Sequence, residues 1–179
     1  MQIEFDIDIK WTAFPLHPET PTAGLTLEEL FSGRPVDIKQ VLERLNRTAR
    51  DLGLPFGKRK RTYNSRLAHE LGKLAEEQGC GQRYHMAAFK AYFAKGLNIG
   101  LQSTLLDLGT SVGLPAQQVL EVLEKRTFED AVDKDWKRSY QSGVTAVPTF
   151  MINGISLVGA QPYEKLAQLM ESSGIMKRA

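Results

Sequence analysis

Cysteine is almost absent from this 179-residue sequence, which contains only Cys80. One cysteine excludes an intrachain disulfide and a Cys-x-x-Cys pair. We expect Cys80 to be a small buried hydrophobe. As an alternative, the helix predicted to begin just after it would favour the thiolate, and a lone thiol could form a mixed disulfide with glutathione without running a dithiol cycle.

The sequence also lacks the features of metal, membrane and nucleic-acid proteins. Its three histidines are scattered without the spacing of metal ligands, so we expect no metal site. It has no apolar run near the ~20 residues of a membrane span, and its first residues do not resemble a signal peptide. The net charge is only +2, and the basic run Lys58-Arg59-Lys60-Arg61 is interpreted as a solvated loop. These absences predict a cytoplasmic protein that binds neither membrane nor nucleic acid.

What is present suits one globular domain, alone or carrying an insertion. The chain is 42% hydrophobic and 25% charged, which provides enough apolar surface for a core. Apolar residues at every second position from Ile3 to Ile9 predict a half-buried strand that extends to Trp11. A proline-rich connection follows it.

Most of the remaining chain shows helical periodicity. Thr26 and Glu29 have the spacing of a capping box, and Gly53 and Gly79 follow two apolar stripes as helix stops. Asn64-Ser65 is the predicted cap of the second stripe. The predicted helices lie near residues 26–30, 36–52, 66–78, 82–95, 103–112, 115–124, 128–141 and 162–170.

A β-hairpin separates the last two helices. Asn153-Gly154 predicts a type I′ turn between a buried strand Thr149–Ile152 and a returning strand Ile155–Val158. Pro148 must lie at a strand start or edge, because it cannot donate to a ladder. It is also a candidate for a cis bond, which would turn the N–H and C=O of Val147 outward for an extended peptide or glutathione backbone.

Several short motifs occur in an order that resembles a known family. Gly143-Val144-x-x-Val147-Pro148-Thr149-Phe150, followed by Gly159-Ala160-Gln161-Pro162, is similar to the cis-proline segment of the DsbA-like thioredoxin-fold family. Trp11-x-x-Phe14-x-Leu16-x-Pro18 resembles its second strand and exit, and Asn64-x-x-x-Ala68-His69 resembles the start of its helical insertion. The resemblance spans about residues 5–170. It is closest to the FrnE-type branch, which is related to 2-hydroxychromene-2-carboxylate isomerases and kappa-class glutathione transferases.

The resemblance implies a thioredoxin-like α/β fold of the DsbA type. Residues 1–63 and 126–179 would form the thioredoxin-like portion, and residues 64–125 the helical insertion. It also implies a substrate-binding surface at Val147, Pro148, Asn64 and His69. Taken alone, the position of His69 beside the apolar face of its helix favours a hydrogen-bonded helix residue over a direct chemical role.

The sequence departs from the family pattern at its start. The family's first strand, its Cys-x-x-Cys helix and the corresponding serine of the isomerases precede the segment matching Ile3–Trp11, so no catalytic residue is predicted here. In the family fold the first strand lies in the sheet between the strands predicted at Ile3–Trp11 and Thr149–Ile152. Without it, the facing edges of these two strands would be unpaired. A late gene start, a strand donated by a partner chain, or a smaller closed sheet would each explain this. We favour a late start for the gene and a homodimer for the chain as written.

The function hypotheses follow from the same comparison. The first is a FrnE-like relative of thiol-disulfide oxidoreductases that is redox-inactive as this chain. The second is a binding module for a thiol-containing peptide or glutathione. A glutathione-dependent isomerase or transferase relative is the third, and an interaction protein without a small ligand the fourth. No cofactor is predicted, and glutathione is the candidate ligand.

Overall fold

The computed structural model describes residues 1–178 and divides into two compact units. The first unit combines Met1–Leu16 with the chain from Lys134 onward, and the second comprises His17–Asp133. Each is described by itself. The predicted division into residues 1–63 with 126–179 and an insertion at 64–125 remains a prediction. None of the helices within residues 1–178 is both long and apolar enough to cross a bilayer.

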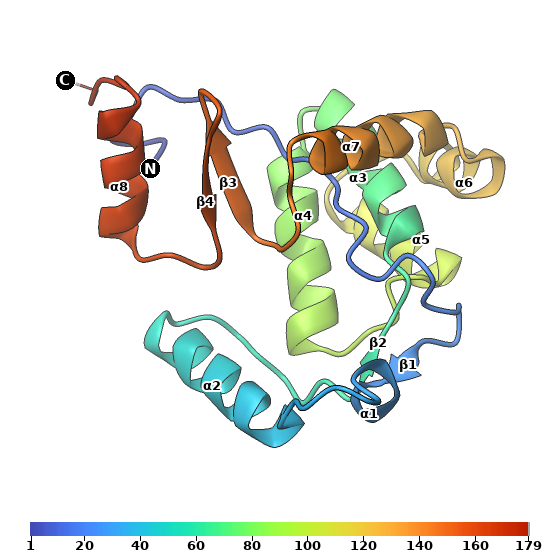
Figure 1. Cartoon of the computed structure of the whole chain (residues 1–179). Helices are drawn as coiled ribbons and strands as arrows, with labels where there is room; N and C mark the ends of the chain where they lie inside the picture. Colours follow the sequence, from blue (N-terminus) through green and yellow to red (C-terminus); the bar gives the residue numbers. More distant parts are fainter. Residues whose placement is uncertain (179) are drawn as a thin grey trace. The chain divides into compact units, whose positions relative to one another are not determined.

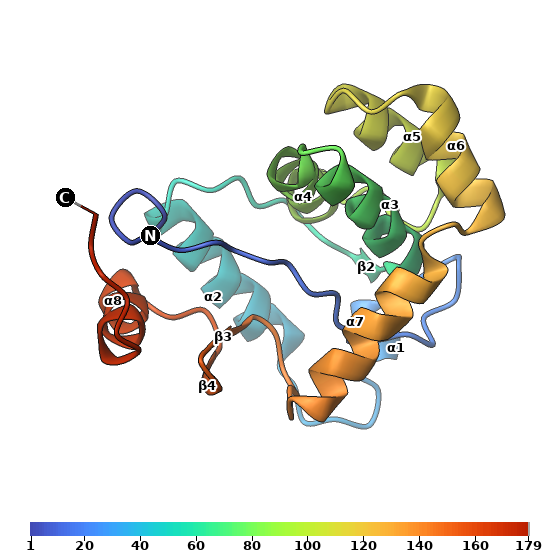
Figure 2. The same ribbon diagram turned by 90° about the horizontal axis from the view of Figure 1, so that it is seen from above.

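The second unit is mainly helical (Figure 1). Its helices are α1 (Leu27–Leu30), α2 (Ile38–Asp51), α3 (Arg66–Glu77), α4 (Gly81–Phe89) with a π-helical continuation (Lys90–Ala94), α5 (Gln102–Ser111), α6 (Ala116–Lys125) and the first residues of α7 (Glu129–Gln141). Helices α3 and α4 pack side by side (Figure 2). Helices α3 to α6 share one core that includes Leu71, Tyr84, Leu105, Val119 and Leu123.

Local sequence signals account for several helix ends in this unit. The capping box of α1 is confirmed: the Thr26 hydroxyl accepts the Glu29 N–H at 3.1 Å, and the Glu29 carboxylate accepts the Thr26 N–H at 2.7 Å. Asp37 caps α2 in the same way by accepting the N–H of Gln40. A two-residue antiparallel pair, β1 (Leu25–Thr26) with β2 (Arg61–Thr62), was not predicted, because so short a strand leaves no periodic pattern.

The first unit is built on the predicted hairpin. Strands β3 (Thr149–Ile152) and β4 (Ile155–Val158) pair antiparallel, and Asn153 and Gly154 turn the chain with φ of +48° and +81°. Pro162 caps α8 (Tyr163–Ser172), which lies beside the hairpin in Figure 1. Phe5, Leu169 and Met170 form the core of this unit, with Ile152 and Leu157 against them.

Two predictions about strands are wrong. Residues 3–11 form only one isolated bridge, Phe5 with Lys177, instead of a strand. No strand within residues 1–178 lies alongside to form a ladder, so the alternating side chains bury only Phe5, while Ile3 and Ile9 are exposed. Strand β3 is also not buried: its two central residues, Phe150 and Met151, are 37% and 46% exposed.

Candidate functional site

Val147 and Pro148 form a fixed corner ahead of the hairpin. Their peptide bond is cis. The Thr149 hydroxyl donates to the Ala146 carbonyl at 2.6 Å, and the Gly159 N–H donates to the Pro148 carbonyl at 2.7 Å. These two bonds hold the chain on both sides of Val147, so its backbone conformation is set before any ligand arrives.

Val147 itself leaves its backbone available. Val147 is 45% exposed, and within residues 1–178 its backbone N–H and C=O make no hydrogen bond. One donor and one acceptor in a fixed, exposed segment can pair with an extended chain in the manner of an added strand. Exposed apolar side chains continue along the hairpin, and the strand register places Phe150 and Ile155 on one face and Met151 and Val158 on the other.

Asn64 has a structural role in the second unit. Its side-chain amide donates both hydrogens, to the carbonyls of Pro18 and Thr20 at 3.0 Å each. Its amide oxygen accepts the N–H of Arg66 at 2.9 Å. Both Asn64 donors are therefore used in holding the loop at residues 18–20 against the start of α3, and a ligand would have to compete for them.

His69 lies one turn further along α3 and is half-buried, with its backbone N–H donating to the Ser65 carbonyl at 2.9 Å. The four predicted site residues thus fall into two pairs, Val147 with Pro148 in the first unit and Asn64 with His69 in the second. Their roles in binding remain predictions.

The sequence analysis missed a buried charge cluster beside His69. Glu70 is fully buried and accepts from Arg66 Nε at 2.9 Å, and from Arg126 Nε and Nη2 at 2.7 and 2.6 Å. The hydrogen bond to Glu70 raises the pKa of Arg126, which therefore stays charged. Arg66 and Glu70 are four residues apart on a predicted helix, so their ion pair was visible in the sequence, but Arg126 was not. The cluster joins α3 to Arg126 just beyond α6, and Arg66 also pairs with Asp133 of α7 at 2.8 Å, so its role is structural.

Cys80 is buried at 4% exposure in the helical core, as predicted for a small hydrophobe. A buried thiol without access to solvent or substrate does not act as a nucleophile. Within residues 1–178, His, Cys, Asp and Glu do not gather in any group of three that could hold a metal ion.

A β-hairpin preceded by a proline and followed by a helix, together with a helical unit, makes this a mixed α/β protein with a large helical part. Residues 1–171 match the family described as DSBA-like thioredoxin domain. The chain therefore belongs to the DSBA-like thioredoxin domain family, as its sequence motifs indicated.

Known proteins agree with this assignment. A probable DsbA oxidoreductase from Streptomyces coelicolor superposes with a TM-score of 0.82 at 25% identity, over 91% of this chain and 74% of that one. A 2-hydroxychromene-2-carboxylate isomerase shares the fold, with a TM-score of 0.72 at 19% identity, over 93% of this chain and 79% of that one. The uncharacterized protein YwbO of Bacillus subtilis is 36% identical over 95 residues, which are 52% of this chain and 48% of the relative. The match spans about half the length of that relative.

Proposed function

We propose that this chain binds an extended thiol-containing peptide or glutathione along Val147 and Pro148 and performs no dithiol–disulfide exchange by itself. The observation that carries the proposal is the exposed, unpaired backbone of Val147, held between the hydrogen bonds at Ala146 and Pro148. The family assignment supports it, because the S. coelicolor protein with the same fold is a probable DsbA oxidoreductase. A DsbA-type protein must accept a thiol or disulfide substrate.

The absence of exchange chemistry follows from the cysteine content of the 179 residues. Dithiol–disulfide exchange proceeds through a mixed disulfide that a second thiol resolves. The chain has only Cys80, which is buried. We expect no turnover in an insulin-reduction assay, and family-like rates would contradict this part of the proposal.

Binding can be tested without redox chemistry. S-methylglutathione, which cannot form a disulfide, should shift the amide signals of Val147 and Thr149 in a ¹H–¹⁵N spectrum. Val147→Pro removes the proposed backbone donor, whereas Val147→Ala keeps it and serves as the matched control. We expect the proline variant to weaken binding by about tenfold, the value of one hydrogen bond, and the alanine variant by far less. Unmoved signals at Val147 and Thr149 would overturn the proposal.

We further propose that the chain forms a homodimer. In its own unit β3 pairs with β4 on one side only, and four exposed apolar side chains lie on the hairpin: Phe150, Met151, Ile155 and Val158. An open, apolar strand edge is a template for pairing with another chain.

A further inference from the structure

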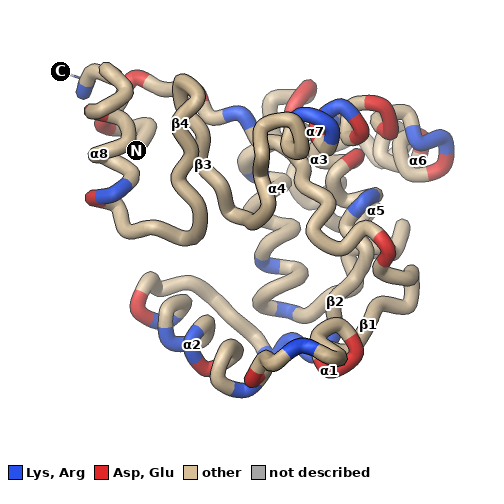
Figure 3. The backbone as a smooth tube through the Cα atoms, viewed as in Figure 1, with Lys and Arg blue, Asp and Glu red and all other residues tan. Residues whose placement is uncertain are grey.

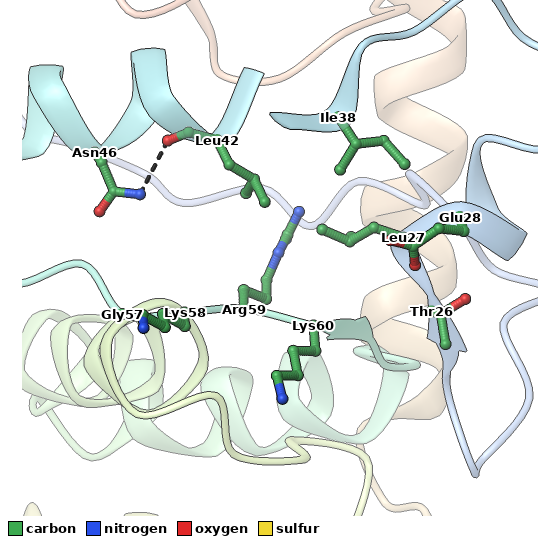
Figure 4. Close-up of a pocket in the computed structure, with 10 residues that line it drawn as sticks. All are labelled: Thr26, Leu27, Glu28, Ile38, Leu42, Asn46, Gly57, Lys58, Arg59 and Lys60. Carbon is green, nitrogen blue, oxygen red and sulfur yellow. Dashed lines mark hydrogen bonds between the residues drawn. The ribbon is translucent and has the colours of Figure 1, made fainter. Parts of the chain in front are cut away.

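A cavity of about 490 Å³ lies within the second unit, between α2 and the extended segment that leads to β2 (Figure 4). Its size falls within the ~300–1,000 Å³ that small-molecule sites occupy. The cavity is remote in sequence from Val147 and Pro148 and belongs to a different unit. The proposed function makes no use of it.

One wall of the cavity is apolar. Ile38 and Leu42 come from successive turns of α2, and Leu27 faces them from α1. Most of α2 is exposed, and Ala49 is its only fully buried residue. Both signs of charge occur along the helix (Figure 3), but the face toward the cavity carries Ile38 and Leu42, followed one turn later by the uncharged Asn46. This wall would gain stability if an apolar molecule covered it.

The opposite wall supplies a positioned cation. Arg59 rises from the segment toward Leu42 and Leu27 in Figure 4. Its Nη1 donates to the Tyr92 hydroxyl at 3.0 Å, and its guanidinium carbon lies 5.3 Å from the Tyr92 ring centre and 5.7 Å from that of Phe93. These contacts hold the guanidinium in place.

One hydrogen-bond donor of Arg59 is nevertheless unsatisfied. Its Nε is buried and has no hydrogen-bond partner within residues 1–178. A buried donor left without an acceptor costs free energy, and an anionic acceptor would recover it. Lys58 and Lys60 also line the cavity, against a single carboxylate, Glu28. The local charge therefore favours an anion.

From these two walls we infer a second ligand site: the cavity between α2 and residues 57–60 binds a small amphipathic carboxylate, with Arg59 on the carboxylate and Ile38 and Leu42 on its apolar body. Charge complementarity selects the anionic head, because three basic residues and one acidic residue line the cavity. The apolar stripe of α2 selects a tail over a fully polar anion such as phosphate. A fatty acid of medium length has this chemistry.

The test uses the full chain and decanoate below its micelle concentration, followed by calorimetry and ¹H–¹⁵N spectra. We expect saturable binding of one decanoate, with shifts at Leu27, Leu42 and Arg59 and none at Val147. Arg59→Gln should weaken binding by about tenfold or more, because it removes a charge-assisted hydrogen bond. Glu28→Gln should tighten binding, since it removes the one opposing charge.

Matched controls separate this site from general attraction. Arg44→Gln removes a cation from the exposed face of the same helix and should change the affinity less than about twofold. Leu42→Asn tests the apolar wall on an exposed helix, should Arg59→Gln fail to fold, and is expected to weaken decanoate binding. Binding of decyltrimethylammonium as tight as that of decanoate, an unchanged affinity in both Arg59→Gln and Leu42→Asn, or the absence of saturable binding would each overturn the inference.

Discussion

Glu70 places a carboxylate in the interior of the second unit. The free-energy cost of burying this charge is offset only because charged partners bind it. Arg126 supplies two of its three hydrogen bonds while adopting a left-handed backbone, φ +56°, just beyond α6. A left-handed conformation is costly for a residue with a side chain, so the ion pair stabilises both the charge and the bend.

The first prediction concerns this pair. Arg126→Met leaves Glu70 with Arg66 alone. We expect the free energy of unfolding to fall by about 2–3 kcal/mol, less than the ~3–5 kcal/mol of a fully buried pair, because the Arg126 side chain is 36% exposed and Arg66 remains. Urea denaturation measures the change. The control is Lys125→Met, at the residue before Arg126. It removes an exposed ion pair with Glu121 and should lower the free energy of unfolding far less than Arg126→Met does. Equal losses of unfolding free energy in the two variants would contradict a stabilising role for the Glu70–Arg126 pair.

A second prediction at this scale is a pH dependence at Glu76. Burial opposes ionisation of Glu76, but hydrogen bonds from His85 at 3.1 Å and Lys73 at 3.0 Å outweigh it, and its pKa lies below the usual 4.5. A lowered folded-state pKa adds stability above pH 4.5, and that stability is lost as the pH falls through the lower value.

Glu76→Gln should therefore destabilise the chain at about pH 7, and this disadvantage should disappear as the pH falls below 4.5 and through the lowered pKa of Glu76. Urea melts at several pH values measure the difference between variant and wild type. Glu77→Gln removes an exposed carboxylate from the same helix and controls for net charge. If the difference in unfolding free energy between variant and wild type stays constant from neutral to acid pH, the ionised Glu76 is not stabilised by His85 and Lys73.

At the scale of the element, α5 packs closely because of Gly109. A Cβ at this position would lie 2.8 Å from Val119 Cγ2 and 3.4 Å from Leu71 Cδ2. Real Cβ contacts are almost never that short, so an alanine would push α5 away from α6. Glycine lowers the helix propensity at this position, but it allows α5 and α6 to pack closely.

The third prediction follows from that packing. Glycine to alanine inside a helix ordinarily stabilises by about 1 kcal/mol, but we expect Gly109→Ala to destabilise by about 1–3 kcal/mol through overpacking. Val119→Ala in the same chain should restore part of the loss, because it removes the clashing methyl groups. A double-mutant cycle on unfolding free energies measures the coupling. Additive effects would mean that the two helices do not meet at Gly109 and Val119.

The same scale shows which parts of the fold the sequence reveals. The hairpin and the capping box were predicted correctly, because their signals are local: positive φ at Asn153-Gly154, and the Thr26–Glu29 spacing. Residues 3–11 alternate like a strand but form none, because a ladder needs a neighbour that periodicity cannot supply. At the candidate site, the motif indicated Val147 and Pro148, whose role in binding remains a prediction. The Glu70–Arg126 pair, 56 residues apart, left no periodic signal.

At the scale of the whole molecule, each unit has its own core, and the hairpin leaves apolar surface uncovered in the first one. Its two strands, each of four residues, form a very small sheet. A hairpin of this size gains stability chiefly from what packs on it. Within its unit α8 and Phe5 cover part of it, but the outer edge of β3 has no partner strand.

The last prediction is that β3 pairs with β3 of a second copy, so that the chain is a dimer. Size-exclusion chromatography with light scattering should give twice the mass of one chain at micromolar concentration. Met151→Arg places a charge on the exposed edge strand and should raise the dimer dissociation constant at least about tenfold, because the charge must lose its water in the interface. Gln168→Arg adds the same charge on the exposed side of α8 and should leave the dimer intact. If the wild-type chain is monomeric at every concentration, or if both variants dissociate it equally, the β3 edge is not the interface.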